Sequence, residues 1–160
     1  MTSDDMLLAR IERIEAELAL GALINRYHKR ADAFDWVGWS ECFTGDAVYE
    51  MPHSFGKMEG RQRIHDVCKA NMQGRLQKMQ HIIVNASFEL TGSDTATGSA
   101  NVIFGAVPDK NKPGQNYVSG GRYRWEFRRL PDEGWLISRA EAEPVWNIGT
   151  SSGGVFDRSA

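Results

Sequence analysis

Residues 81–90 read HIIVNASFEL, and this stretch decides the fold class. Its apolar and polar side chains alternate with a period of two, which is typical of a β-strand. Stretches of the same period follow at 96–107, 117–129 and 135–143, separated by segments rich in Gly, Pro, Asn and Asp. Strands in such hairpin succession predict one strongly curved antiparallel sheet.

The alternation also predicts which faces of the strands are buried. In 81–90 a continuous apolar face runs from Ile82 to Leu90, and His81 lies on the opposite, mostly polar face. In 117–129 one face is charged and the other aromatic. The aromatic face is predicted to be buried and comprises Tyr117, Tyr123, Trp125 and Phe127.

The chain before residue 81 is predicted to be mainly helical. Apolar residues recur at steps of three and four up to about residue 35, and Gly21 is predicted to divide this part into two helical segments. A short helix at 36–43, a short strand at 46–51 and a helix at 61–72 follow. Helices at the front and hairpin strands behind indicate an α+β domain.

Length and composition narrow the class of protein. The 160 residues fit one domain spanning 1–160, with a Gly- and Ser-rich tail expected to be loose from about residue 149. A formal net charge of -2 gives no field that would hold nucleic acid. No apolar run is long enough to span a membrane, so no membrane partner is expected.

The expected location follows from the first residues and from the cysteines. Charged residues interrupt every apolar stretch near the start, so we expect no secretory signal and a cytoplasmic protein. Cys42 and Cys68 are then predicted to be free, buried thiols rather than a disulfide.

One carboxylate stands out in the first helical region. Tyr27, Ala31 and Asp35 are spaced at i, i+4 and i+8, so a continuous helix would place them on one stripe that prolongs a core-facing apolar row. A buried carboxylate must be paired or hydrogen-bonded. The alternative is that Asp35 caps the next helix, and both roles can coexist. Asp32 falls off this stripe and is predicted to face solvent.

Of the four histidines, His81 has the most suggestive position, at the start of the strongest strand. His28 lies on a basic helix flank and is predicted to be exposed. A neutral imidazole can take a proton near neutral pH, and a carboxylate on its other nitrogen fixes the tautomer. Asp35 and His81 are therefore the candidate catalytic pair.

Five further side chains are candidates for binding a substrate: Tyr27, Arg30, Tyr49, Tyr123 and Arg139. Arginine in an apolar row can hold an oxyanion, although such a residue more often reaches the rim or pairs with an acid. Tyrosine can donate to a substrate oxygen, although a buried hydroxyl often only satisfies a backbone carbonyl.

Several chemistries have no sequence signature in this chain. There is no zinc-like spacing of Cys or His, no phosphate-binding glycine loop after a strand, and no G-x-S-x-G segment. We therefore expect no metal and no cofactor, which leaves cofactor-free chemistry or plain binding.

Five segments in order resemble the SnoaL-like branch of the nuclear transport factor two-like superfamily. They are YHKRADAFDW at 27–36, FTGDAVY at 43–49, MEG at 58–60, HIIVN at 81–85 and GWLI at 134–137. The resemblance extends over roughly residues 8–145. It implies a cone-shaped sheet wrapped by the N-terminal helices around an apolar pocket, the cystatin-like α+β barrel.

The chain is similar to the branch that holds hexachlorocyclohexane dehydrochlorinase, bile acid dehydratase and scytalone dehydratase. This resemblance implies an Asp–His dyad at Asp35 and His81, elimination without a cofactor, and a homodimer or homotrimer formed through the open sheet face. It places Arg30 where the dehydrochlorinase has a pocket lysine. It places Ala140 where that enzyme has a pocket arginine, so Arg139 reaches the pocket only if a bulge intervenes.

The sequence thus supports three hypotheses. The first is a cofactor-independent lyase, a dehydratase-like enzyme acting on a hydrophobic, ring-containing small molecule. The second is an isomerase or cyclase of the ketosteroid isomerase or polyketide cyclase type, which uses the same base. The third is a non-catalytic module that binds a ligand or assembles with a partner. A cavity of ~300 Å³ or more would accept a small ring system.

Overall fold

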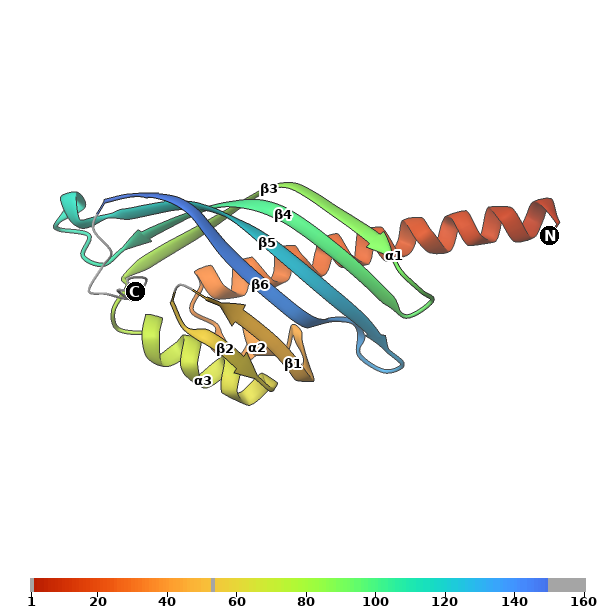
Figure 1. The fold of residues 1–160 in the computed structure, drawn as a ribbon, viewed down its shortest axis with the longest axis horizontal. Coiled ribbons are helices and arrows are strands. Elements are labelled where there is room, and N and C mark those ends of the chain that lie inside the picture. Colours follow the sequence, from red (N-terminus) through yellow and green to blue (C-terminus); the bar gives the residue numbers. More distant parts are fainter. Residues whose placement is uncertain (1, 53, 150–160) are drawn as a thin grey trace.

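A computed structural model describes residues 2–52 and 54–149 of the chain. The predicted loose tail from about residue 149 therefore lies almost entirely outside the described residues. The α+β architecture is confirmed, with the three α-helices of the described residues in the first half of the chain and the longest strands in the second half (Figure 1). In chain order the elements are α1 (Ser3–Asp32), α2 (Trp36–Ser40), β1 (Phe43–Met51), β2 (Gly56–Glu59), α3 (Arg61–Met72), β3 (Lys78–Leu90), β4 (Thr95–Val107), a 3-10 turn (Pro113–Gln115), β5 (Tyr117–Leu130) and β6 (Gly134–Ile148).

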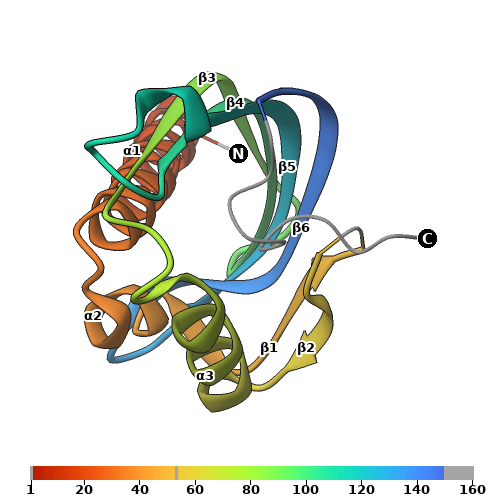
Figure 2. The same cartoon turned by 90° about the vertical axis from the view of Figure 1, so that its left-hand side faces the viewer.

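The six strands form one curved sheet in the order β2-β1-β6-β5-β4-β3. The helices lie on its concave side, opposite the long strands (Figure 2). The sheet is mixed rather than antiparallel, because β1 pairs with β6 in parallel while all other pairs are antiparallel. Hairpin turns fix the direction of consecutive strands, whereas β1 and β6 are far apart in the chain and no turn constrains them.

Helix α1 is one continuous helix of 30 residues, so the predicted break at Gly21 is wrong. Glycine inside a helix costs only about 1 kcal/mol relative to Ala, and the fully buried Leu20 and Leu23 on either side of it hold the helix against the sheet. A capping box starts the helix, because Thr2 and Asp5 each bond the other's backbone N–H. Within 2–52 and 54–149, no helix combines the length and the apolar character needed to cross a membrane.

Helix α3 has the bounds that the sequence predicts. Gly60 precedes it with a φ of 87°, a conformation that residues with a side chain rarely adopt. Ile64, Cys68 and Met72 are buried along one side of the helix. Cys42 and Cys68 are both free and buried, as predicted.

Strand β3 departs from the predicted faces. The pairing with β4 shifts between Val84 and Ser87, and Asn85 has a φ of 57°, so a β-bulge interrupts the alternation. Ile82 and Val84 consequently lie exposed, whereas Phe88 and Leu90, beyond the bulge, pack against the core. The predicted continuous apolar face is therefore wrong, since the extra residue reverses the side to which later side chains point.

Candidate active site

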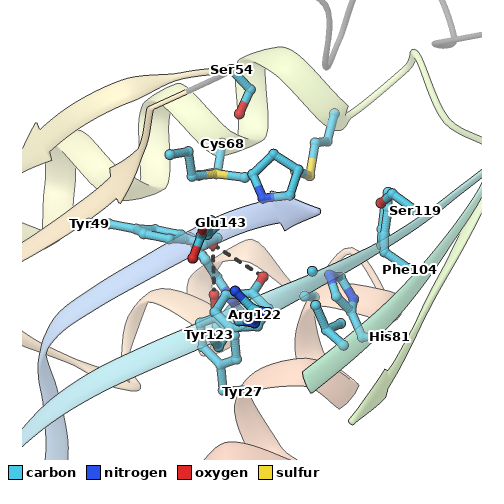
Figure 3. A pocket seen from close by; sticks show the side chains of 18 of the residues that line it. Tyr27, Tyr49, Ser54, Cys68, His81, Phe104, Ser119, Arg122, Tyr123 and Glu143 are labelled. Carbon is cyan, nitrogen blue, oxygen red and sulfur yellow. Dashed lines mark hydrogen bonds between the residues drawn. The ribbon is translucent and has the colours of Figure 1, made fainter. Parts of the chain in front are cut away.

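A cavity of about 100 Å³ lies between the concave face of the sheet and the helices (Figure 3). Its wall is mainly aromatic and sulfur-containing, while Arg122 and Glu143 supply charged groups. This volume is smaller than the ~300 Å³ given above as sufficient for a small ring system. The aromatic and sulfur-containing lining residues are Tyr27, Trp36, Trp39, Tyr49, Met51, Cys68, Met72, Phe104, Tyr117 and Tyr123.

His81 lines this cavity and forms two hydrogen bonds with Asp32. The Nδ1 atom of His81 lies 2.6 Å from Oδ1 of Asp32, and the backbone N–H of His81 donates to Oδ2 at 3.0 Å. Only 10% of the His81 side chain and 25% of the Asp32 side chain are exposed. Because both carboxylate oxygens are used, Asp32 fixes the position of the imidazole and leaves Nε2 as the nitrogen available to a bound molecule.

Asp35 does not contact His81, so the predicted pair is corrected to Asp32 and His81. Helix α1 ends at Asp32, and Phe34 turns the chain with a φ of 58°. Asp35 then serves as N-cap of α2, where Oδ1 accepts from the backbone N–H of Gly38 at 3.0 Å. The i+8 stripe assumed a helix that continued through Asp35. The alternative of a helix cap is confirmed.

His28 is buried, with 4% of its surface exposed, contrary to the prediction that it is exposed. Its ring centroid lies 5.2 Å from that of His81, and Phe104 contacts His81 at 4.7 Å. Burial and the nearby His81 lower the pKa of His28 to about 3. His28 is therefore neutral at physiological pH, and its Nδ1 lies 2.9 Å from the carbonyl oxygen of Ile24, to which it donates. With Phe104, it confines the His81 ring.

Three tyrosine hydroxyl groups meet in the wall of the cavity, as the dashed lines in Figure 3 show. Tyr27 donates to Tyr49 at 3.2 Å, and Tyr49 lies 3.4 Å from the hydroxyl of Tyr123. All three are buried, and burial raises the pKa of each hydroxyl. They therefore remain protonated and can act as hydrogen-bond donors, not as bases.

The two predicted arginines do not line the cavity. Arg30 donates to Glu41 at 2.9 Å and also contacts the carbonyl of Gly38, which holds it on the outer side of α2. Arg139 pairs with Glu50 at 2.7 Å. A bulge in β6 explains the second case, because the pairing with β5 shifts between Ile137 and Arg139. The shift takes Arg139 out of the inward row of Trp135 and Ile137 and leaves the buried Ala140 pointing inward.

Two alternative roles for the site find no residues to support them. Within residues 2–52 and 54–149, no three His, Cys, Asp or Glu side chains are grouped so as to hold a metal ion. Burial raises the pKa of Cys68 to about 12, so this thiol in the cavity wall stays protonated and is a poor nucleophile. The chemistry that the cavity offers is an imidazole base, its carboxylate and hydroxyl donors.

Sequence reasoning found His81 and the tyrosines but missed Asp32 and His28. A signal for both was present, because His28 and Asp32 are four residues apart and share a stripe of α1 beside the one formed by Tyr27 and Ala31. That stripe faces β3, the strand with which α1 makes its main contact with the sheet. The basic residues next to His28 led to the prediction that this histidine is exposed.

Comparison with solved structures shows relatives of the same fold. A provisionally assigned aromatic ring hydroxylase from Novosphingobium aromaticivorans is 27% identical, with a TM-score of 0.76 over 86% of this chain and 94% of that chain. Hexachlorocyclohexane dehydrochlorinase LinA of type 2 is 15% identical, with a TM-score of 0.78 over 89% and 93%. A provisionally assigned scytalone dehydratase from N. aromaticivorans is 15% identical, with a TM-score of 0.72 over 94% and 93%.

Comparison by sequence gives the family. No curated protein matches the chain. The pattern of the SnoaL-like domain, in contrast, matches residues 12–141, which include α1 from its first third to β6 and every cavity residue named above except Glu143. The chain therefore belongs to the SnoaL-like domain family and has the cone-shaped α+β fold of the nuclear transport factor 2-like superfamily.

Proposed function

We propose that this protein is a cofactor-independent lyase that eliminates water from a small, single-ring hydroxy ketone. The observation that carries the proposal is the 2.6 Å contact between His81 and Asp32 at the wall of a mainly apolar cavity. An imidazole held by a carboxylate is suited to removing a proton from carbon. The likeness to a dehydrochlorinase and to a provisionally assigned dehydratase supports elimination as the class of reaction.

The reaction can be written with the residues present. Nε2 of His81 takes the proton from the carbon next to the substrate carbonyl, and the electron pair of that C–H bond moves into an enolate. The enolate collapses to a C=C bond as the C–O bond to the neighbouring hydroxyl breaks. The imidazolium of His81 returns its proton to the departing oxygen, so that water leaves. Asp32 stabilises the imidazolium while it exists.

The tyrosines supply the group that holds the enolate oxygen. Donors already fixed in a sheltered site stabilise charge that develops during the reaction. Tyr27, Tyr49 and Tyr123 are buried, protonated and hydrogen-bonded to one another, and all three line the same cavity as His81. A carbonyl compound therefore fits this cavity better than a hydrocarbon halide, which has no oxygen to accept from them.

The cavity volume limits the substrate to small molecules. About 100 Å³ is below the volume of ~150 Å³ in which a benzene molecule has been accommodated in an apolar cavity. A single ring therefore already needs the wall to widen, with its polar substituent toward the exposed Arg122 and the partly exposed Glu143. Polycyclic compounds would need a much larger rearrangement of the wall than a single ring does.

The experiment uses 3-hydroxycyclohexanone and 3-cyclohexenone as probes. We expect 3-hydroxycyclohexanone to lose one water and become 2-cyclohexenone. Ultraviolet absorbance and mass spectrometry measure this product. Conversion of the second probe without a change in mass, and no dehydration of the first, would identify an isomerase instead. The decisive comparison is between the wild-type protein and the His81→Gln variant. If the wild type neither converts a probe nor exchanges the probe's α-proton with D2O faster than this variant does, the proposed function is wrong.

Tyr49→Phe tests the role of the hydroxyl chain. Tyr27 donates to Tyr49, so the O–H that is free for the substrate belongs to Tyr49 or Tyr123, whichever way their shared bond runs. We expect Tyr49→Phe to lower kcat by about tenfold, as for loss of one hydrogen bond to developing charge. Tyr27→Phe is the matched control, and its kcat should fall less than that of Tyr49→Phe. Equal losses in steady-state assays would contradict this arrangement.

A further inference from the structure

The N-terminal half of α1 extends beyond the strands (Figure 1). Every residue from 2 to 15 is exposed, yet this segment carries large apolar side chains. Helical segments of this length without tertiary contacts are marginal in water. Covering these apolar side chains would stabilise the segment further.

Four of the six large apolar residues exposed on α1 follow the spacing of a coiled coil, and only Met6 and Leu8 lie off it. Leu7, Ile11, Ile14 and Leu18 are separated by four, three and four residues, and between 43% and 69% of each is exposed. We call these four residues the seam. At 100° per residue, the seam lies nearly opposite the face of α1 that is buried against the sheet, which includes Ala16, Leu20 and Leu23. Such spacing is typical of a helix that pairs with another helix.

We propose that the seam binds the seam of a second copy of this chain, with the two α1 helices antiparallel. Antiparallel pairing places Leu7 against Leu18 of the second copy and Ile11 against its Ile14. The two-fold symmetry repeats each pair, so all four pairs of facing seam residues are apolar. It also brings Arg10 beside Glu17 of the second copy, twice in the dimer. Both are exposed or partly exposed and flank the seam on the same side.

The acidic residue one heptad before Ile11 favours antiparallel over parallel pairing of the two helices. Asp4 occupies that seam position, so parallel pairing would place two Asp4 carboxylates against each other. In the antiparallel arrangement the position opposite Asp4 is Gly21 of the second copy, which has no side chain to obstruct it. Antiparallel helix dipoles also attract, whereas parallel dipoles repel.

The seam is only two heptads long, but its helix is already anchored. Residues 16–32 of α1 pack on the body of the domain, so the costly first turns of the helix are formed before two copies meet. We expect a dimer that dissociates in the micromolar range, as is common for small interfaces.

Ile11→Glu/Ile14→Glu tests the interface by mass. Sedimentation over a range of concentrations should give the wild-type chain twice the mass of the double variant, or a dimer dissociation constant at least about 100-fold lower. The reason is that the variant would bury charged side chains without a partner. Ala9→Glu/Ala19→Glu is the matched control, since it adds the same charge to exposed positions of α1 outside the seam. Equal masses for wild type and the seam variant, or equal losses in the two variants, would overturn the proposal.

Cysteine cross-linking tests the direction. The Leu7→Cys/Leu18→Cys variant should form disulfide-linked dimers on oxidation, seen on a non-reducing gel. Leu18→Cys alone should not, because antiparallel copies hold these residues about 16 Å apart along the helix axis. Cys42 and Cys68 are buried and do not interfere. Cross-linking of Leu18→Cys alone would contradict the antiparallel arrangement.

Discussion

Replacing Asp32 with Asn lowers kcat by at least about 100-fold, because the imidazolium formed on His81 loses the carboxylate that stabilises it. The amide can also turn its NH2 group toward Nδ1 of His81, which favours the tautomer with the proton on Nε2 and removes the base. Asp32 acts through His81 and is a positioning residue. Steady-state assays with 3-hydroxycyclohexanone should therefore show the loss in kcat, with KM changed less than about threefold.

Asp35→Asn is the matched control for this experiment. Asp35 is three residues from Asp32 and carries the same group, but it caps α2 and is half exposed. Asn caps a helix about as well as Asp, so this variant should keep its stability and its activity. If Asp35→Asn loses activity and Asp32→Asn does not, the pairing of His81 with Asp32 is not the catalytic one.

Replacing His81 with Ala lowers kcat by about 1,000-fold, within the range of ~10²–10⁴ for a general base. The residue is on the edge strand β3 and supplies the nitrogen that takes the proton. The protein should still fold, because the backbone bond from His81 to Asp32 does not need the side chain. Circular dichroism and thermal unfolding check this separately from activity.

A second His–Asp pair provides the control. His65 lies 2.8 Å from Asp66 on α3 but does not line the cavity, so His65→Gln should leave kcat unchanged. Added imidazole should restore part of the activity of His81→Ala, since a small base can occupy the space left by the ring. An unchanged rate in His81→Ala would remove this residue from the mechanism.

Periodicity was a reliable guide to the elements and to part of the site. The alternation in 117–129 correctly placed Tyr123 and its aromatic neighbours inward, and helix 61–72 has the predicted bounds. These predictions succeeded because each depends on neighbours within a few residues, where burial of one face is the dominant free-energy term. The alternation in 81–90 placed His81 on the polar face but did not show that this face lines the cavity.

Predictions that depended on where an element ends or bends were wrong. The stripe from Tyr27 to Asp35 required a helix three residues longer than α1. The continuous face from Ile82 to Leu90 required a strand without the bulge at Asn85. Asn adopts positive φ more readily than most residues, so this position was permissive for a bulge, but the sequence does not show that the bulge is used.

The sequence by itself determined the α+β class, the order of most of the elements and the free thiols, and it singled out His81 as the candidate imidazole. Only the tertiary structure decided which carboxylate meets that imidazole, because Asp32 and Asp35 are equivalent in residue type and lie within one turn of each other. The turn at Phe34 sends one toward β3 and the other to the start of α2. Such a choice depends on contacts between residues 49 positions apart, and local patterns carry no information about them.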